Sequence, residues 1–127
     1  MPEQSGIEIQ RLRDRIKSQH ARKAFDLFLS GFKENNGLTS RVGKHGFIND
    51  FRIEAEARNC FAFTVNQSWL LCYFSAPALT AGIFSGEEIQ RLFPDAQQAG
   101  KEWKLRVHNR QEAAQVIDYV SGALHLN

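Results

Sequence analysis

The chain of 127 residues contains few of the residues that cross-link or interrupt a fold, with two cysteines, three prolines and one methionine. The two cysteines and four scattered histidines show no zinc-ligand spacing, which argues against a metal site. No apolar run approaches the roughly 20 residues that cross a bilayer. The first residues lack the apolar centre of a signal peptide. We therefore expect a cytoplasmic protein with free thiols, no membrane association, no metal and no cofactor.

Net charge is also small, at +2, and does not by itself predict a polyanionic partner. Hydrophobic residues make up 43% of the chain and charged residues 24%, as in ordinary globular proteins. Aromatic residues are plentiful instead, with ten Phe and two Trp. At this length we expect one domain over residues 1–127, with enough core to fold without a disulfide or metal.

Residues 5–34 have the pattern of a long helix, preceded by a tail at residues 1–4. Ser5 and Glu8 have the spacing of a capping box, and apolar residues then recur with the helical period. They are Ile9, Leu12, Ile16, Ala24, Leu27, Phe28 and Phe32, with His20 on the same stripe. Such a helix would be about 45 Å long, whereas the domain should be about 36 Å across. The helix therefore either breaks near Ser18, or projects its first turns onto a second copy.

Three short runs with strand-like alternation follow, at residues 51–56, 60–65 and 69–75. The third run is apolar on both faces and should be a central strand. A short helix beginning at Ser85, a strand at 103–107 and a helix capped by Asn109 complete the chain. This α-β-β-β-α-β-α order predicts a single α+β domain. We expect a largely antiparallel four-stranded sheet with the helices packed on one face.

The second face of this sheet is a candidate binding surface. Flanking strands bring Arg52, Glu54, Glu56, Lys104, Arg106 and His108 to it. The central strand adds one of two alternate sets, either Trp69, Leu71 and Tyr73 or Leu70, Cys72 and Phe74. An apolar strip bordered by charge is typical of a ligand groove or a subunit interface, unless residues 76–84 fold over it. The candidate residues of this surface are Trp69, Tyr73, Arg52 and Arg106.

These features favour a non-enzymatic binding or interaction module that forms a homodimer. The dimer would bury either the sheet strip or the helical stripe of Ile9, Leu12 and Ile16. Its other partner would be a protein or a small ligand.

A second hypothesis is nucleic-acid binding through residues 11–23, which contain six Lys or Arg and one Asp. On a continuous helix Arg11, Arg15 and Arg22 fall along one stripe, with Lys44 supplied by the Gly-rich connection at 37–50. Clustered positive charge of this kind binds phosphates, because counterions are released from the nucleic acid.

A third hypothesis comes from the string Pro94-Asp95 followed by Glu102-Trp103-Lys104, which resembles the PD…(D/E)xK signature of restriction-endonuclease-like nucleases. The resemblance implies a Mg²⁺-dependent phosphodiesterase in which Asp95 and Glu102 hold the ion and Lys104 positions the attacking water. In that family these residues belong to the second and third strands of the meander. Here the corresponding runs, 60–65 and 69–75, contain no acidic residue.

Overall fold

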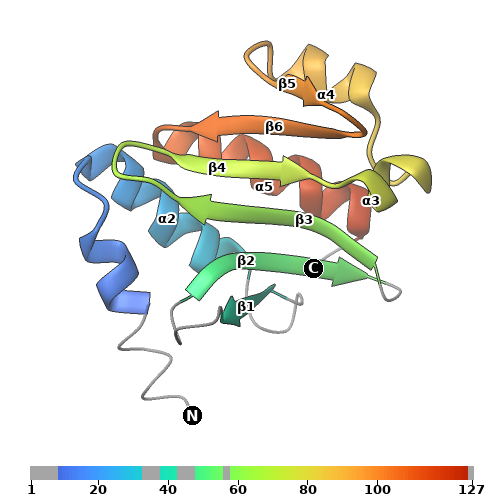
Figure 1. Ribbon diagram of the computed structural model, residues 1–127. Coiled ribbons are helices and arrows are strands. Elements are labelled where there is room, and N and C mark those ends of the chain that lie inside the picture. Colours follow the sequence, from blue (N-terminus) through green and yellow to red (C-terminus); the bar gives the residue numbers. More distant parts are fainter. Residues whose placement is uncertain (1–8, 33–37, 43–47, 56–57, 126–127) are drawn as a thin grey trace.

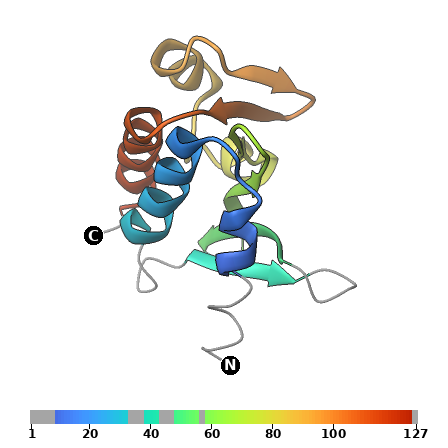
Figure 2. The same ribbon diagram turned by 90° about the vertical axis from the view of Figure 1, so that its left-hand side faces the viewer.

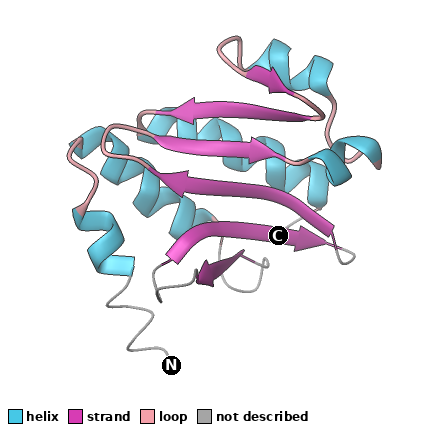
Figure 3. Ribbon diagram, in the orientation of Figure 1, coloured by secondary structure: helices cyan, strands magenta, loops and turns pink. Residues whose placement is uncertain are grey.

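The computed structural model describes residues 9–32, 38–42, 48–55 and 58–125. They form one open antiparallel sheet with the strand order β1-β2-β3-β4-β6-β5 (Figure 1). The strands are β1 (Leu38–Val42), β2 (Ile48–Ala55), β3 (Arg58–Val65), β4 (Leu70–Phe74), β5 (Gln97–Ala99) and β6 (Glu102–Val107). The helices are α2 (Gln19–Gly31), α3 (Ala76–Thr80), α4 (Gly86–Leu92) and α5 (Arg110–Leu124), and residues 9–14 are also helical (Figure 3). Within these residues no helix combines the length and apolarity needed to cross a membrane.

The mixed α+β class and the antiparallel sheet are confirmed, but the predicted four strands and their order are wrong in detail. β1 lies in the segment predicted to be a connection. It pairs with β2 from Leu38 opposite Ile53 to Val42 opposite Ile48, with a register shift between Arg41 and Val42. β5 has only three residues and pairs with β6. α3 begins at Ala76, in a segment for which no helix was predicted. Short edge strands form because a neighbouring strand pairs with them, and their own sequences carry little signal.

The long helix predicted at 5–34 is broken within its described residues. Residues 9–14 form one helix, and α2 begins after Ser18, whose hydroxyl accepts a hydrogen bond from the Ala21 N–H at 3.2 Å. The carbonyl oxygen of Gln67, in the turn between β3 and β4, accepts hydrogen bonds from the Lys17 N–H (2.8 Å) and the Ser18 N–H (3.2 Å). These bonds fix the junction against the end of the sheet.

The break changes the surroundings of the apolar stripe. Ile16 is completely buried in the core of its own chain, and Ile9 and Leu12 pack against that core while partly exposed. His20, which a continuous helix would have placed on the stripe, is exposed. Of the predicted dimer stripe, Ile16 is therefore used fully in intramolecular packing, whereas Ile9 and Leu12 keep exposed surface and a dimer through them stays a prediction.

α2 and α5 pack side by side on one face of the sheet (Figure 2). Phenylalanine fills the space between the layers. The ring of Phe28 in α2 lies 4.8 Å from Phe63 and 6.3 Å from Phe61, measured between centroids. Phe74 of β4 meets Tyr119 of α5 edge to face at 5.8 Å. Because successive residues of a strand point to opposite faces, the residues that alternate with this aromatic layer lie on the other face of the sheet.

The alternation along β4 decides which residues reach that other face. Leu70, Cys72 and Phe74 are buried under the helices, whereas Leu71 and Tyr73 are only half-buried. β4 lies between β3 and β6, so the central position predicted for this strand is confirmed. Cys60 and Cys72 are free and buried, and the β3–β4 register places Phe63, not Cys60, opposite Cys72.

The two later helices begin where the sequence predicted. The Ser85 hydroxyl accepts from the Glu88 N–H at 3.4 Å, and the Asn109 side chain accepts from the Glu112 N–H at 2.9 Å. The Glu112 carboxylate in turn accepts from the His108 N–H at 2.7 Å. These local caps position β6 and His108 relative to α5.

Candidate functional site

The sheet face turned away from α2 and α5 is here called the open face. It presents an aromatic strip formed by β4 and by Trp69, the residue that precedes β4. Trp69, Leu71 and Tyr73 are each half-buried, so their rings and methyl groups remain accessible. The register places Tyr73 between Ala62 of β3 and Lys104 of β6. Leu71 lies between Thr64 and Arg106 in the same way. Of the two alternatives that the sequence left open, the Trp69 set is the one on this face.

Each of the two aromatic rings on the open face carries a cation from β6. The guanidinium carbon of Arg106 lies 4.4 Å from the centre of the Trp69 ring. The ammonium of Lys104 lies 5.5 Å from the centre of the Tyr73 ring. Both distances are within the range of cation–π attraction. The face therefore offers flat apolar surfaces and positive charge at the same positions.

A pocket of about 790 Å³ adjoins this strip and is here called the Trp69 pocket. Its floor is β4 and β6, and one wall is the segment Pro94–Gln97 that leads into β5. The polar groups around Trp69 are Asn66, Asp95, Gln97, Lys104, Arg106 and His108. The imidazole ring of His108 lies 6.4 Å from the Trp69 ring and 3.1 Å from a Glu112 carboxylate oxygen. The pocket is thus open, polar at its rim and aromatic at its base.

Arg52 lies on the same face but forms an ion pair with Asp50 of its own strand, β2. Its Nε atom is 3.3 Å from an Asp50 carboxylate oxygen without forming a well-directed hydrogen bond. Asp50 is only 8% exposed, so this ion pair belongs partly to the interior. Arg52 is thus half-buried and paired with an acid, whereas Arg106 is exposed.

Residues 76–84 do not cover the aromatic strip. Phe84 packs at 5.4 Å from both Phe74 and Tyr119, on the helical side of the sheet. Ala78 is buried in the same core. Within the part of the chain that the structure describes, the strip therefore stays accessible.

The basic segment 11–23 is divided between two helices, and part of its charge is used internally. The Arg13 guanidinium makes two hydrogen bonds to the Asp26 carboxylate, at 2.8 and 3.0 Å, and this contact raises the pKa of Arg13. Arg22 donates to the Ile16 carbonyl at 2.6 Å. Arg11 and Arg15 are exposed, and Lys44 lies outside the described residues. Arg11, Arg15 and Arg22 therefore do not share one helical stripe.

The three residues of the nuclease hypothesis are only partly brought together. Asp95, in the turn before β5, lines the Trp69 pocket with Lys104. Glu102 starts β6 opposite Ala99 and does not line that pocket. Among the described residues no group of three His, Cys, Asp or Glu side chains could hold a metal ion. Asp95 and Lys104 thus share a pocket that Glu102 does not line, and the two-acid ion site stays a prediction.

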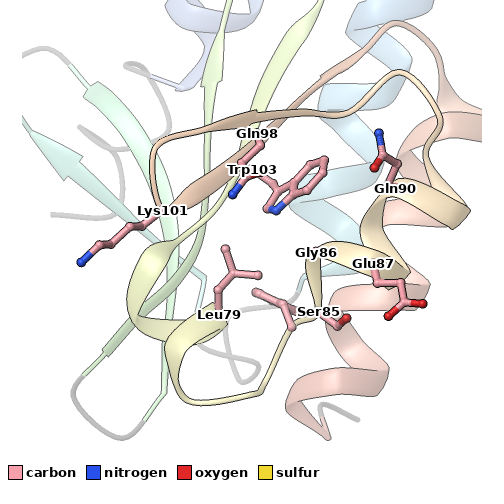
Figure 4. Close-up of a pocket in the computed structure, with 9 residues that line it drawn as sticks. Leu79, Ser85, Gly86, Glu87, Gln90, Gln98, Lys101 and Trp103 are labelled. Carbon is pink, nitrogen blue, oxygen red and sulfur yellow. The ribbon is translucent and has the colours of Figure 1, made fainter.

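A second pocket, of about 630 Å³, lies between α4 and the β5–β6 hairpin (Figure 4). The Trp103 indole lies at its centre and Gly86 beside it, with Gln90, Gln98 and Lys101 at the rim. Its polar groups point in several directions, and its one cation lies at the edge. Its polar groups therefore converge less on one ligand position than the polar groups of the Trp69 pocket do.

The cysteines do not add a nucleophile to either pocket. Burial raises the pKa of the Cys72 thiol, so it stays protonated at neutral pH. The Cys60 thiol is buried and faces the Arg58 carbonyl at 3.6 Å.

Sequence patterns indicated the residues of the open face but not their pairing. Alternation placed Lys104 and Arg106 on one face of their strand, yet the register against β4 determines which ring each cation meets. Because two helices and a strand intervene between β4 and β6, no local signal sets that register. Fold class alone does not identify a function, so any inference about function must rest on the side chains of the open face.

No family model matches this chain, and no curated protein and no solved structure matches it significantly.

Proposed function

We propose that this protein is a non-enzymatic binding module whose open sheet face binds single-stranded nucleic acid. The observation that carries the proposal is the pair of aromatic rings on β4 and its entrance, each with a β6 cation over it. A single strand presents two kinds of group, flat bases and negatively charged phosphates. Aromatic rings stack bases, and neighbouring cations take phosphates, which is how many sheet surfaces bind single strands.

The Trp69–Arg106 pair is the centre of the proposed site. Arg106 is exposed whereas Trp69 is half-buried, so the guanidinium forms the outer layer of the pair. A base can stack on the guanidinium plane, because the plane is flat and weakly hydrated. Asn66, Gln97 and His108 border the ring and supply hydrogen-bonding groups for base edges.

Positive charge exceeds negative charge around the site. Lys104 and Arg106 line the Trp69 pocket together with one acid, Asp95. In duplex nucleic acid the bases are stacked inside and cannot reach a sheet face, so a single strand fits this surface better.

The direct test is a fluorescence anisotropy titration with labelled thymidine and uridine dodecamers and with a duplex control. We expect both single strands to bind in a salt-dependent manner and the duplex to bind more weakly. Trp69→Ala should weaken binding roughly 5- to 150-fold, because stacking contributes about 1–3 kcal/mol per base. Trp69→Phe should retain most of the affinity. The two strands compared together separate DNA from RNA preference.

Arg106→Gln has a matched control in Arg91→Gln. Arg91 is also exposed, but it lines neither the Trp69 pocket nor the second pocket, between α4 and the β5–β6 hairpin. Both variants remove one positive charge. We expect only Arg106→Gln to weaken binding by more than about twofold, because only Arg106 is stacked at the site. Absence of binding at low salt would refute the proposal, and so would equal affinity of wild type, Trp69→Ala and Arg106→Gln.

Self-association through the same face is the second candidate. Half-buried Trp69, Leu71 and Tyr73 with charged residues beside them also have the composition of a protein interface. In that case sedimentation equilibrium should show a dimer that Trp69→Ala dissociates, and added oligonucleotide should leave the dimer unchanged.

A further inference from the structure

Two exposed cations lie next to the open face although they come from the other end of the sequence. Arg15 and Lys17 line a pocket of about 590 Å³ together with Asn66 and Gln67 of the β3–β4 turn. Asn66 also lines the Trp69 pocket. The two pockets therefore adjoin across this turn, and together they contain four cations, Arg15, Lys17, Lys104 and Arg106, against two acids, Asp14 and Asp95.

The backbone holds these cations in place relative to the turn. The Gln67 carbonyl accepts hydrogen bonds from the N–H groups of Lys17 and Ser18. Ile16, between Arg15 and Lys17, is completely buried. The Arg22 guanidinium donates to the Ile16 carbonyl at 2.6 Å and fixes the same peptide from the other side. The positions of Arg15 and Lys17 therefore follow from the fold and do not depend on a free helix end.

The side chains of Arg15 and Lys17 are available to a ligand. Within the described residues, neither side chain makes a hydrogen bond or ion pair, in contrast to Arg13 with Asp26 and Arg22 with Ile16. The acid in their pocket, Asp14, already accepts a hydrogen bond from the Gln10 side chain at 2.9 Å. Two unpaired cations beside an aromatic pocket are suited to phosphates that continue a bound strand.

We infer that a single strand bound at Trp69 continues across the β3–β4 turn and places its next phosphates on Arg15 and Lys17. This inference rests on the proposed function and adds a direction and a second contact region to it. Bases are held at Trp69 and Arg106, and the turn at Asn66 and Gln67 separates that region from the phosphate contacts.

The test compares Arg15→Gln/Lys17→Gln with Arg11→Gln/Lys23→Gln, titrated with a thymidine dodecamer at several salt concentrations. Arg11 and Lys23 are exposed but line neither pocket, so the second variant loses the same charge nearby without losing the contacts. Each phosphate contact on a single strand contributes about 0.7 to the slope of log K against log salt. We expect the slope to fall by about 1.4 for the Arg15/Lys17 variant, with little change for the control.

The outcomes separate this inference from the proposed function. Equal slopes for the two double variants, with binding still dependent on Trp69, would overturn the path across the turn and leave the open face as the site. Loss of any dependence on Trp69 and Arg106 would refute the proposed function itself. A lower slope for Arg15→Gln/Lys17→Gln alone, with Trp69 still required, supports the path.

Discussion

At the scale of single residues, Gly86 shows how closely the backbone of α4 approaches an aromatic ring. A Cβ atom at this position would lie 2.6 Å from Nε1 and 3.0 Å from Cε2 of Trp103. The indole would have to move, and Trp103 packs against the core. A small residue at the start of α4 is therefore required by the position of Trp103.

We predict that Gly86→Ala lowers the free energy of unfolding by about 1–3 kcal/mol, the usual cost of overpacking. Gly122→Ala is the matched control, since Gly122 lies within α5 and a Cβ there meets no atom within 4 Å. The control should be stabilised by about 0.5–1 kcal/mol, because alanine favours helix. Urea denaturation followed by tryptophan fluorescence measures both, and equal stabilities for Gly86→Ala and wild type would contradict the prediction.

A second prediction at this scale concerns Cys72 and the dependence of the free energy of unfolding on pH. Burial raises the pKa of its thiol in the folded protein, whereas the unfolded thiol has a pKa of about 8.5. The stability that this protonated thiol contributes is complete below about pH 8.5 and declines as pH rises above that value. The limiting decline is about 1.4 kcal/mol per pH unit for one thiol.

Cys72→Ala should remove this decline, whatever its effect at neutral pH. Urea denaturation of both proteins from about pH 7.5 to 10 covers the region in which the unfolded thiol ionises. The wild type should lose stability more steeply than the variant above about pH 8.5. Parallel profiles would mean that the folded thiol ionises as easily as the unfolded one.

At the scale of elements, the break before α2 depends on Ser18. Its hydroxyl caps the first turn of α2, so Ser18→Ala should destabilise the protein by about 1 kcal/mol. Ser30→Ala is the control, because the Ser30 hydroxyl bonds back to the Leu27 carbonyl at 3.3 Å and caps nothing. Thermal or urea unfolding distinguishes them, and an equal effect of the two substitutions would argue against the cap.

The starts of α4 and α5 were predictable because their signals are local. Ser85 and Asn109 lie within three residues of the N–H groups that they cap, so a short stretch of sequence defines each helix start. β1 and β5 were missed because they become strands only by pairing with β2 and β6. A break of the N-terminal helix near Ser18 could be expected only by comparing the length of a continuous helix with the size of the domain. The contact with Gln67 that accompanies the break is not local in sequence.

At the scale of the whole molecule, the candidate site was only half predictable. Alternation identified Trp69 and Tyr73 as one of two sets that could occupy the second face. The choice between the sets depends on which side α2 and α5 cover, and that depends on packing across the whole chain. The proximity of Arg15 to Asn66 is likewise a tertiary result. The basic segment was therefore recognised, but its relation to the sheet was not.

The closure of the aromatic core by α5 has a consequence for biosynthesis. Phe74, Phe84 and Phe93 all pack against Tyr119 of this helix, within 5.4 to 6.1 Å between ring centres. During translation these three residues are synthesised before Tyr119 and the rest of α5. Until α5 has emerged, the nascent chain exposes the aromatic surface that chaperones bind and that drives aggregation. We therefore expect the nascent chain to be most prone to aggregation before that helix is complete.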